Sequence, residues 1–142
     1  MMDKLDGYNE GAIEVFQIAE AYSKENMNAA IEPAHVLKAL LHKDVGLIAF
    51  IEKALNADYY YILDWADMRI RMLKKDTDSS HAKSFSATTK AVINEADSIR
   101  ISTKKDKIDP ISLLIAIVTP GVGFSFEQLK TLPLQKDDIM VA

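Results

Sequence analysis

The feature that most constrains this chain is an internal repeat. When the segment that begins at Tyr8 is written above the segment that begins at Phe85, a constant shift of 77 positions, apolar residues align without a gap. The matched pairs are Val15 with Val92, Ala19 with Ala96, Ile31 with Ile108, Pro33 with Pro110, Leu37 with Leu114, Ala39 with Ala116, Gly46 with Gly123 and Leu55 with Leu132. Unrelated helices share a period but rarely one register across a proline and a glycine, so we infer a duplicated unit.

Two helices are predicted at the start of each unit. Apolar residues at three- and four-residue spacing predict a long amphipathic helix over residues 9 to about 26, and a copy that begins at the N-cap residue Ser86. A short, almost entirely apolar helix follows. It opens in both units where an acid precedes a proline at the first helical position, at Glu32-Pro33 and at Asp109-Pro110.

Further helices are predicted in the rest of each unit. In the first unit they cover residues 47–55 and about 58–74; in the second, residues 124–132 match the third helix, and Ala142 cuts the fourth short. Residues 76–84 have no apolar periodicity and predict an exposed linker between repeat one, about 8–75, and repeat two, about 85–142. No segment alternates with period two for long, so the predicted fold class is all-α.

Composition argues against several classes of function. The 142 residues, 49% apolar and 27% charged, predict one globular domain. Without cysteine the chain has no disulfide, thiol nucleophile or thiolate metal site. A net charge of −4, with lysines clustered only near predicted helix ends at 74–75 and 104–107, argues against nucleic acid as a partner. No apolar run approaches the ~20 residues that span a bilayer and no secretory leader is visible, so we expect no membrane partner and a cytoplasmic location.

No pattern of a catalytic or cofactor-binding site is present. The P-loop pattern GxxxxGK[ST] and the motifs HExxH and GxSxG do not occur. His35 and His42 would lie about 10 Å apart along a helix, too far to share a metal ion, and His81 falls in the linker. We therefore predict that this chain is not an enzyme and holds no metal or cofactor. His35 is expected to hydrogen-bond the backbone near the start of its helix.

Three consecutive tyrosines, Tyr59, Tyr60 and Tyr61, open the predicted fourth helix. Consecutive side chains on a helix point about 100° apart, so at least one ring should be exposed. Such a ring either contacts a partner or covers the edge of the core, and the sequence leaves both readings open.

The most specific string in the chain is IEPAHVLKALL, residues 31–41. It resembles the signature of the Clp N-terminal repeat, and residues 108–118 are a weaker copy in which Ser112 replaces the histidine. The resemblance covers nearly the whole chain from Tyr8 onward and implies two pseudo-twofold-related four-helix repeats in one compact domain. It also implies a module that docks protein substrates or adaptors for a hexameric AAA+ unfoldase, with the ATPase domains elsewhere in the parent protein.

The resemblance further implies an apolar groove near the start of the first helix, which takes an extended segment or a helix. Helix-in-groove docking requires only apolar anchors at helical spacing. The positions that match this groove are Tyr8, Asn9, Ala12 and Ile13, with Ser86, Thr88 and Thr89 on the facing copy.

Departures from the family narrow the expected partner. The branch that recognises phosphorylated arginine has a glutamate immediately before the histidine of each repeat, whereas this chain has Ala34 and Ile111. We therefore do not expect that ligand. Together with Ser112, the divergence favours the branch that recycles contracted type VI secretion sheaths. The alternatives are a stand-alone helical adaptor and a small-ligand-binding helical protein.

Overall fold

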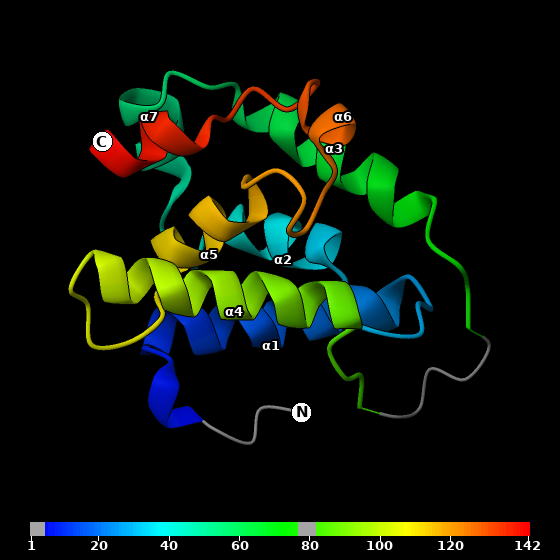
Figure 1. Cartoon of the computed structure of the whole chain (residues 1–142). Coiled ribbons are helices and arrows are strands. Elements are labelled where there is room, and N and C mark those ends of the chain that lie inside the picture. Colours follow the sequence, from blue (N-terminus) through cyan, green and yellow to red (C-terminus); the bar gives the residue numbers. More distant parts are fainter. Residues whose placement is uncertain (1–4, 77–81) are drawn as a thin grey trace.

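The computed structural model describes residues 5–76 and 82–142, and within these ranges the regular structure is helical (Figure 1). The predicted all-α fold class is therefore confirmed. Strand-like contacts in the described residues are isolated bridges. In chain order, the elements are η1 (Leu5–Gly7), α1 (Glu10–Glu25), α2 (Pro33–Leu40), the π-helix η2 (Phe50–Ala54), α3 (Tyr59–Arg71), α4 (Ala87–Ser102), α5 (Pro110–Ile117), α6 (Phe126–Leu129) and α7 (Lys136–Val141).

The helix boundaries repeat with the shift found in the sequence. α4 begins and ends 77 residues after α1, α5 does the same relative to α2, and α7 begins 77 residues after α3. The first helix of each repeat also ends in the same way, at a left-handed residue: Met27 (φ 55°) and its counterpart Lys104 (φ 60°). Residues with a Cβ adopt this conformation at a cost. Its recurrence at matching positions shows that both repeats use the same turn.

Local hydrogen bonds explain where the helices begin. Asn9 Oδ1 accepts the Ala12 N–H (2.8 Å) and Ser86 Oγ accepts the Thr89 N–H (3.1 Å), so α1 and α4 each have a polar N-cap. α2 and α5 each begin with a proline and carry a capping box. The start signals read from the sequence are therefore satisfied by hydrogen bonds in the fold.

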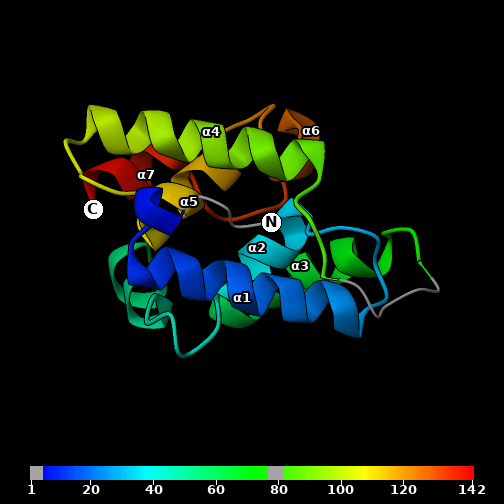
Figure 2. The same cartoon turned by 90° about the horizontal axis from the view of Figure 1, so that it is seen from below.

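The helices are arranged in layers. α1 and α4 run antiparallel along one face, α2 and α5 lie in the middle, and α3, α6 and α7 lie on the far side (Figures 1 and 2). Leu37 of α2 and Leu114 of α5 are fully buried, as are most residues of these two helices. Because apolar burial is the main favourable term in folding, α2 and α5 are the centre that holds the outer layers together.

Short backbone pairs interlock the two repeats. A parallel bridge joins Tyr8 to Ile108, and its counterpart joins Phe85 to Ile31. In the first bridge, the Asn9 N–H donates to the Ile108 carbonyl (2.9 Å). The start of each repeat's first helix is therefore bonded to the start of the other repeat's second helix.

Some predicted helices differ in extent from those observed. The helix predicted over residues 124–132 is the short α6, which begins after Ser125 because the Ser125 hydroxyl caps the Gln128 N–H (3.1 Å). The helix predicted over about 58–74 ends at Arg71. Within the segment predicted as 47–55, the backbone widens into a π-helical turn, in which the Leu55 N–H donates to the Phe50 carbonyl (3.1 Å).

The predicted linker is only partly visible, since residues 77–81, with His81, lie outside the described residues. Lys83, near its end, is not exposed as expected but is 3% accessible. The Lys83 N–H donates to a carboxylate oxygen of Glu20 (2.7 Å). This bond ties the entry of repeat two to α1.

Candidate protein-docking face

The predicted docking residues lie at two ends of one face. Because α1 and α4 are antiparallel, the start of α1 and the start of α4 point to opposite ends (Figure 2). One end holds Tyr8, Asn9, Ala12 and Ile13, and the other holds Ser86, Thr88 and Thr89. The structure therefore does not bring the seven residues together at a single point.

A row of aromatic rings connects the two ends. The rings of Tyr8 and Phe16 meet edge to face with centroids 5.2 Å apart, and Phe16 meets Phe85 in the same manner at 5.1 Å. Burial raises the pKa of the Tyr8 phenol, and the nearby charge of Asp97 on α4 raises it further. The row thus begins at Tyr8, before α1 and near Asp97 of α4. It ends at Phe85, just before the N-cap of α4.

Two of the predicted residues have no accessible surface. Ala12 and Thr89 are fully buried, and the Thr89 hydroxyl donates to the Ile31 carbonyl (2.7 Å). Asn9 and Ser86 act as the N-caps of their helices. These four residues shape the ends of α1 and α4, and the half-buried Tyr8 and Ile13 remain as surface that a partner can reach.

Ile101, near the end of α4, is an exposed apolar residue that the sequence reasoning missed. Its side chain is 60% accessible. It lies one helical turn beyond Asp97, near the end of α4 that is at the same end of the molecule as the start of α1 (Figures 1 and 2). The signal was present in the sequence, because Ile101 falls on the side of the helix opposite the predicted core positions of α4.

Ile13 is placed on the facing side of α1 by a similar argument. Two helical turns separate it from Glu20, whose carboxylate accepts the N–H of Lys83 just before α4. We call the surface formed by Tyr8, Ile13, Phe85 and Ile101 around the buried Phe16 ring the α1–α4 face. It combines apolar side chains with aromatic rings.

Other exposed apolar groups lie on the far side of the molecule. Tyr60 is 72% accessible, which confirms that at least one of the three tyrosines is exposed. The Tyr61 hydroxyl donates to the Thr131 carbonyl (2.9 Å) and so holds α3 against the segment after α6. Thr88 lines a cavity of about 250 Å³ with, among others, Met72 of α3 and Phe124.

His35 has a structural place in repeat one. Its ring is buried, Nδ1 accepts the Glu32 N–H (2.8 Å), and Nε2 donates to Asn28 Oδ1 (2.8 Å). Burial, with a smaller contribution from the charge of Lys38, lowers the pKa of His35 to about 4. The ring is therefore neutral near pH 7, and the expected backbone hydrogen bond is confirmed.

Candidate metal ligands do not gather in the described ranges, where no group of three or more His, Asp or Glu side chains could hold an ion. His42 instead accepts the Asp44 N–H through Nδ1 (3.1 Å). None of the helices that the structure describes is both long enough and apolar enough to cross a membrane.

Comparison with known families identifies the class of protein that this fold defines. The family of the Clp repeat (R) N-terminal domain matches residues 7–131, and the chain belongs to that family. Domains of this family are typically non-catalytic modules of AAA+ proteins that bind substrates or adaptors. No curated protein sequence matches the chain at a significant level.

Solved structures support the same fold. The N-terminal domain of the ClpV1 ATPase from the E. coli EAEC Sci1 type VI secretion system is 17% identical, with a TM-score of 0.78 over 96% of this chain and 83% of that one. The N-domain of ClpV from Vibrio cholerae is 12% identical (TM-score 0.77; 94% and 80% covered). The Hsp104 N-terminal domain from Candida albicans is 15% identical (TM-score 0.77; 94% and 87% covered). At these identities the likeness concerns the fold.

Proposed function

We propose that this chain captures protein substrates or adaptors on its α1–α4 face and presents them to an AAA+ unfoldase of which it is the N-terminal module. It acts in the cytoplasm without a metal or cofactor of its own, and the parent protein forms a hexamer through its ATPase domains. The family assignment supports the docking role. The observation that carries the choice of face is the ring row from Tyr8 to Phe85, together with the exposed Ile101 near the end of α4.

An apolar segment is the partner that suits this face. Tyr8, Ile13 and Ile101 lose unfavourable contact with water when an apolar side chain covers them. A helix that presents apolar residues at i, i+3 and i+4 spacing, or an extended segment with alternate apolar residues, meets this requirement. The separation of the two ends along α1 favours an elongated partner over a small molecule.

Substitution on the face tests the proposal. A variant with Ile13→Glu and Ile101→Glu should bind a fluorescently labelled, reduced and carboxymethylated protein at least about tenfold more weakly, because docking would then desolvate charges. Fluorescence anisotropy measures the affinity, and circular dichroism checks that the variant is folded.

The matched control is Met68→Glu with Met72→Glu, which places the same two charges at exposed apolar residues of α3 and its C-cap. It should leave the affinity unchanged. Loss of binding in this control, with binding retained in the variant of Ile13 and Ile101, would move the docking surface to α3.

The finer proposal is that the partner is the sheath of a type VI secretion system. The absence of glutamate at Ala34 and Ile111 supports a branch other than the one that reads phosphorylated arginine. Pull-down with purified sheath subunits should recover the chain, and the variant of Ile13 and Ile101 should not be recovered. Binding to unfolded proteins without any binding to sheath subunits would leave the docking role intact but contradict this partner.

The link to an ATPase has a separate test. The gene should encode a P-loop downstream of Ala142, and the isolated chain should have no ATPase turnover. A stop codon directly after Ala142 would favour a stand-alone adaptor.

A further inference from the structure

The turns that follow α1 and α4 have the same backbone. We call residues 26–32 loop one and residues 103–109 loop two. The N–H groups of Met27 and Lys104 donate three residues back (both 3.1 Å), and those of Asn28 and Lys105 donate five residues back (2.9 and 2.8 Å). The carbonyl groups of Met27 and Lys104 therefore occupy equivalent places in the two repeats.

Loop one is covered by the chain itself. Asn28 forms an antiparallel bridge with Lys75, and the Asp76 N–H donates to the Met27 carbonyl. The side chain of Asn28 also donates to the Lys74 carbonyl (3.2 Å). Residues 74–76 thus lie along loop one through a single bridge, and Asn28 is buried.

Loop two has no such cover in the part of the chain that the structure describes. Residues 101–107 are all exposed, and no described group donates a hydrogen bond to the Lys104 carbonyl. A cavity of about 400 Å³ lies at the loop, lined by Asn9, Lys105, Asp106, Lys107 and Asp109. The backbone edge that residues 74–76 occupy in repeat one is open in repeat two.

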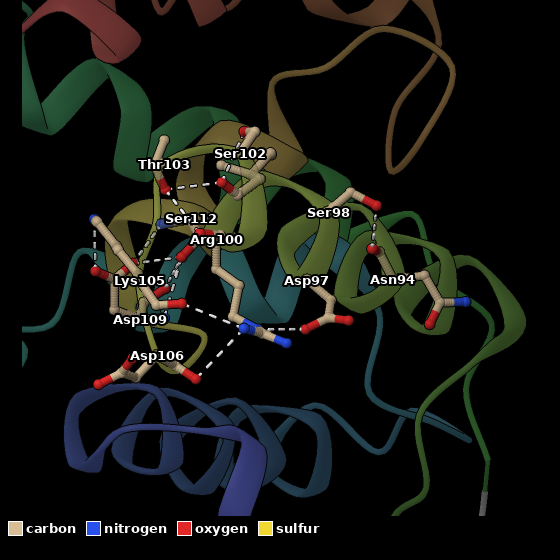
Figure 3. A network of polar contacts seen from close by, with 11 residues as sticks. Asn94, Asp97, Ser98, Arg100, Ser102, Thr103, Lys105, Asp106, Asp109 and Ser112 are labelled. Atoms are coloured by element: carbon tan, nitrogen blue, oxygen red, sulfur yellow. Dashed lines mark hydrogen bonds and ion pairs between the residues drawn. The ribbon is translucent and has the colours of Figure 1, made fainter.

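Side chains nevertheless hold loop two in place, as Figure 3 shows. The Arg100 guanidinium donates to the carbonyls of Lys105 (3.2 Å) and Asp106 (3.4 Å), while its Nε pairs with Asp97 (2.6 Å). Lys105 pairs with Asp109 (2.8 Å). Because the edge is fixed before a partner arrives, little ordering entropy opposes pairing.

We infer that loop two is a second docking edge, which pairs with an extended, acidic segment of a partner protein. A backbone N–H of the partner donates to the Lys104 carbonyl, as the Asp76 N–H donates to the Met27 carbonyl. Main-chain hydrogen bonds supply the register, as in other cases of strand addition. This edge adjoins the α1–α4 face, because Tyr8 pairs with Ile108, but its test uses Lys104 and Lys107, which are not part of that face. The inference therefore holds or fails independently of the proposed function.

The positive charge of loop two indicates that its partner segment is acidic. Residues 103–107 contain three lysines and one aspartate, whereas the chain as a whole has a net charge of −4. Lys104 and Lys107 are exposed within this stretch. Acidic side chains that flank the pairing backbone are attracted to them, and a basic segment such as residues 74–76 is repelled.

The probe is a blocked synthetic peptide of about ten residues with alternating glutamate and valine, a pattern that favours an extended backbone. Its titration into the isotopically labelled chain should shift the amide resonances of residues 103–107. The variant Lys104→Glu with Lys107→Glu should bind at least about tenfold more weakly, and added salt should weaken binding to the original chain. The matched control, Lys43→Glu with Lys53→Glu, makes the same charge change at exposed lysines elsewhere and should bind like the original chain.

A second peptide separates backbone pairing from attraction of charge alone. It has the same sequence but carries N-methyl groups on alternate residues of the pairing edge, and it should produce no shifts at residues 103–107. Equal binding of both peptides would overturn the inference, as would shifts confined to other residues, no shifts at millimolar peptide, or equal weakening by the control variant. A concentration-dependent dimer that contacts through residues 103–107 would assign the edge to a second copy and overturn the proposed partner.

Discussion

Loop one and loop two have the same backbone course but opposite side-chain chemistry. At equivalent positions loop one and its surroundings have neutral, buried groups, whereas loop two and its surroundings have charged groups. The pairs are Ser23 with Arg100 and Asn28 with Lys105. Residues 74–76 lie against Asn28 of loop one, which is buried, so only a neutral group with complete hydrogen bonds is stable at that position. Loop two remains hydrated, so its ion pairs keep much of their solvation. The two turns have the same backbone, so the difference in side chains follows from the presence of residues 74–76 against loop one and the lack of such a segment at loop two in the described part of the chain.

The capping residues show the same contrast. Burial tends to raise the pKa of Asp109, but hydrogen bonds from Lys105 and Ser112 outweigh it and leave the pKa below its usual value. In repeat one the third residue of the helix is His35, whose pKa moves down to about 4 because its charged form is not tolerated. Repeat two therefore stabilises the charged carboxylate of Asp109 at its helix cap, whereas repeat one keeps the ring of His35, at the third helical position, neutral.

The largest effect on the free energy of unfolding is expected at a position that has the same residue in both repeats. Leu37 and Leu114 are equivalent and fully buried. Leu37→Ala and Leu114→Ala should each lower the free energy of unfolding by about 2–5 kcal/mol, since each leaves a cavity. Urea denaturation measures the loss, with the exposed Met72→Ala as a control that should stay within about 0.5 kcal/mol. A small loss at only one leucine would show that the halves are packed unequally.

The next effect concerns pH and repeat one alone. The pKa of His35 is lowered from 6.5 to about 4 in the folded chain, so its contribution to stability is complete above pH 6.5 and is lost as the pH falls toward 4. The corresponding loss in the free energy of unfolding is about 3 kcal/mol. Denaturation at pH 7, 5.5 and 4 measures it.

The control for the pH effect comes from the other repeat. His35→Ser gives position 35 the residue that repeat two has at Ser112, so the part of the pH dependence due to His35 should disappear. An unchanged slope between pH 7 and 4 in this variant would show that other groups cause the loss.

A smaller effect on stability should distinguish a substitution of Asn28 from a substitution of its counterpart Lys105. Asn28→Ala removes the acceptor of the buried His35 Nε2–H and should lower the free energy of unfolding by about 1–3 kcal/mol. Lys105→Ala breaks only a partly exposed ion pair with Asp109 and should cost below about 0.5 kcal/mol. Thermal denaturation at two salt concentrations distinguishes them, because only the Lys105 variant should lose sensitivity to salt. Equal losses would contradict the contrast between the loops.

Much of the fold could be predicted because its signals are local. Pro33 and Pro110 marked the start of α2 and α5, and Ser86 marked the cap of α4, since capping and proline effects act within one turn of helix. The start of α6 has a signal of the same local kind, the capping box of Ser125 and Gln128, which the comparison of the repeats did not use. The π-helical turn at Phe50–Ala54 has no side-chain cap that would mark it in the sequence.

The candidate site was predictable only in part. Tyr8 and Ile13 do have accessible surface, but Ala12 and Thr89 are buried, and the helical period that places Ala12 with Val15, on the core side, already indicated this. When site positions are taken from a resemblance to a family, residues that contact a partner are not distinguished from buried residues that hold the contacting residues in place. The role of Asn28 was not predicted. Its contact with Lys74 arises only when the chain after α3 returns to loop one, and its contact with His35 depends on the course of the turn between α1 and α2.

The crossed bridges between Tyr8 and Ile108 and between Phe85 and Ile31 have a consequence for the history and the folding of the chain. A polypeptide with a single repeat can form these pairs only with a second copy of itself, through the residues just before its first and second helices. The present domain is thus equivalent to such a homodimer whose halves have been joined into one polypeptide. Neither half retains its full set of bonds when alone, so the domain gains or loses its structure as a whole.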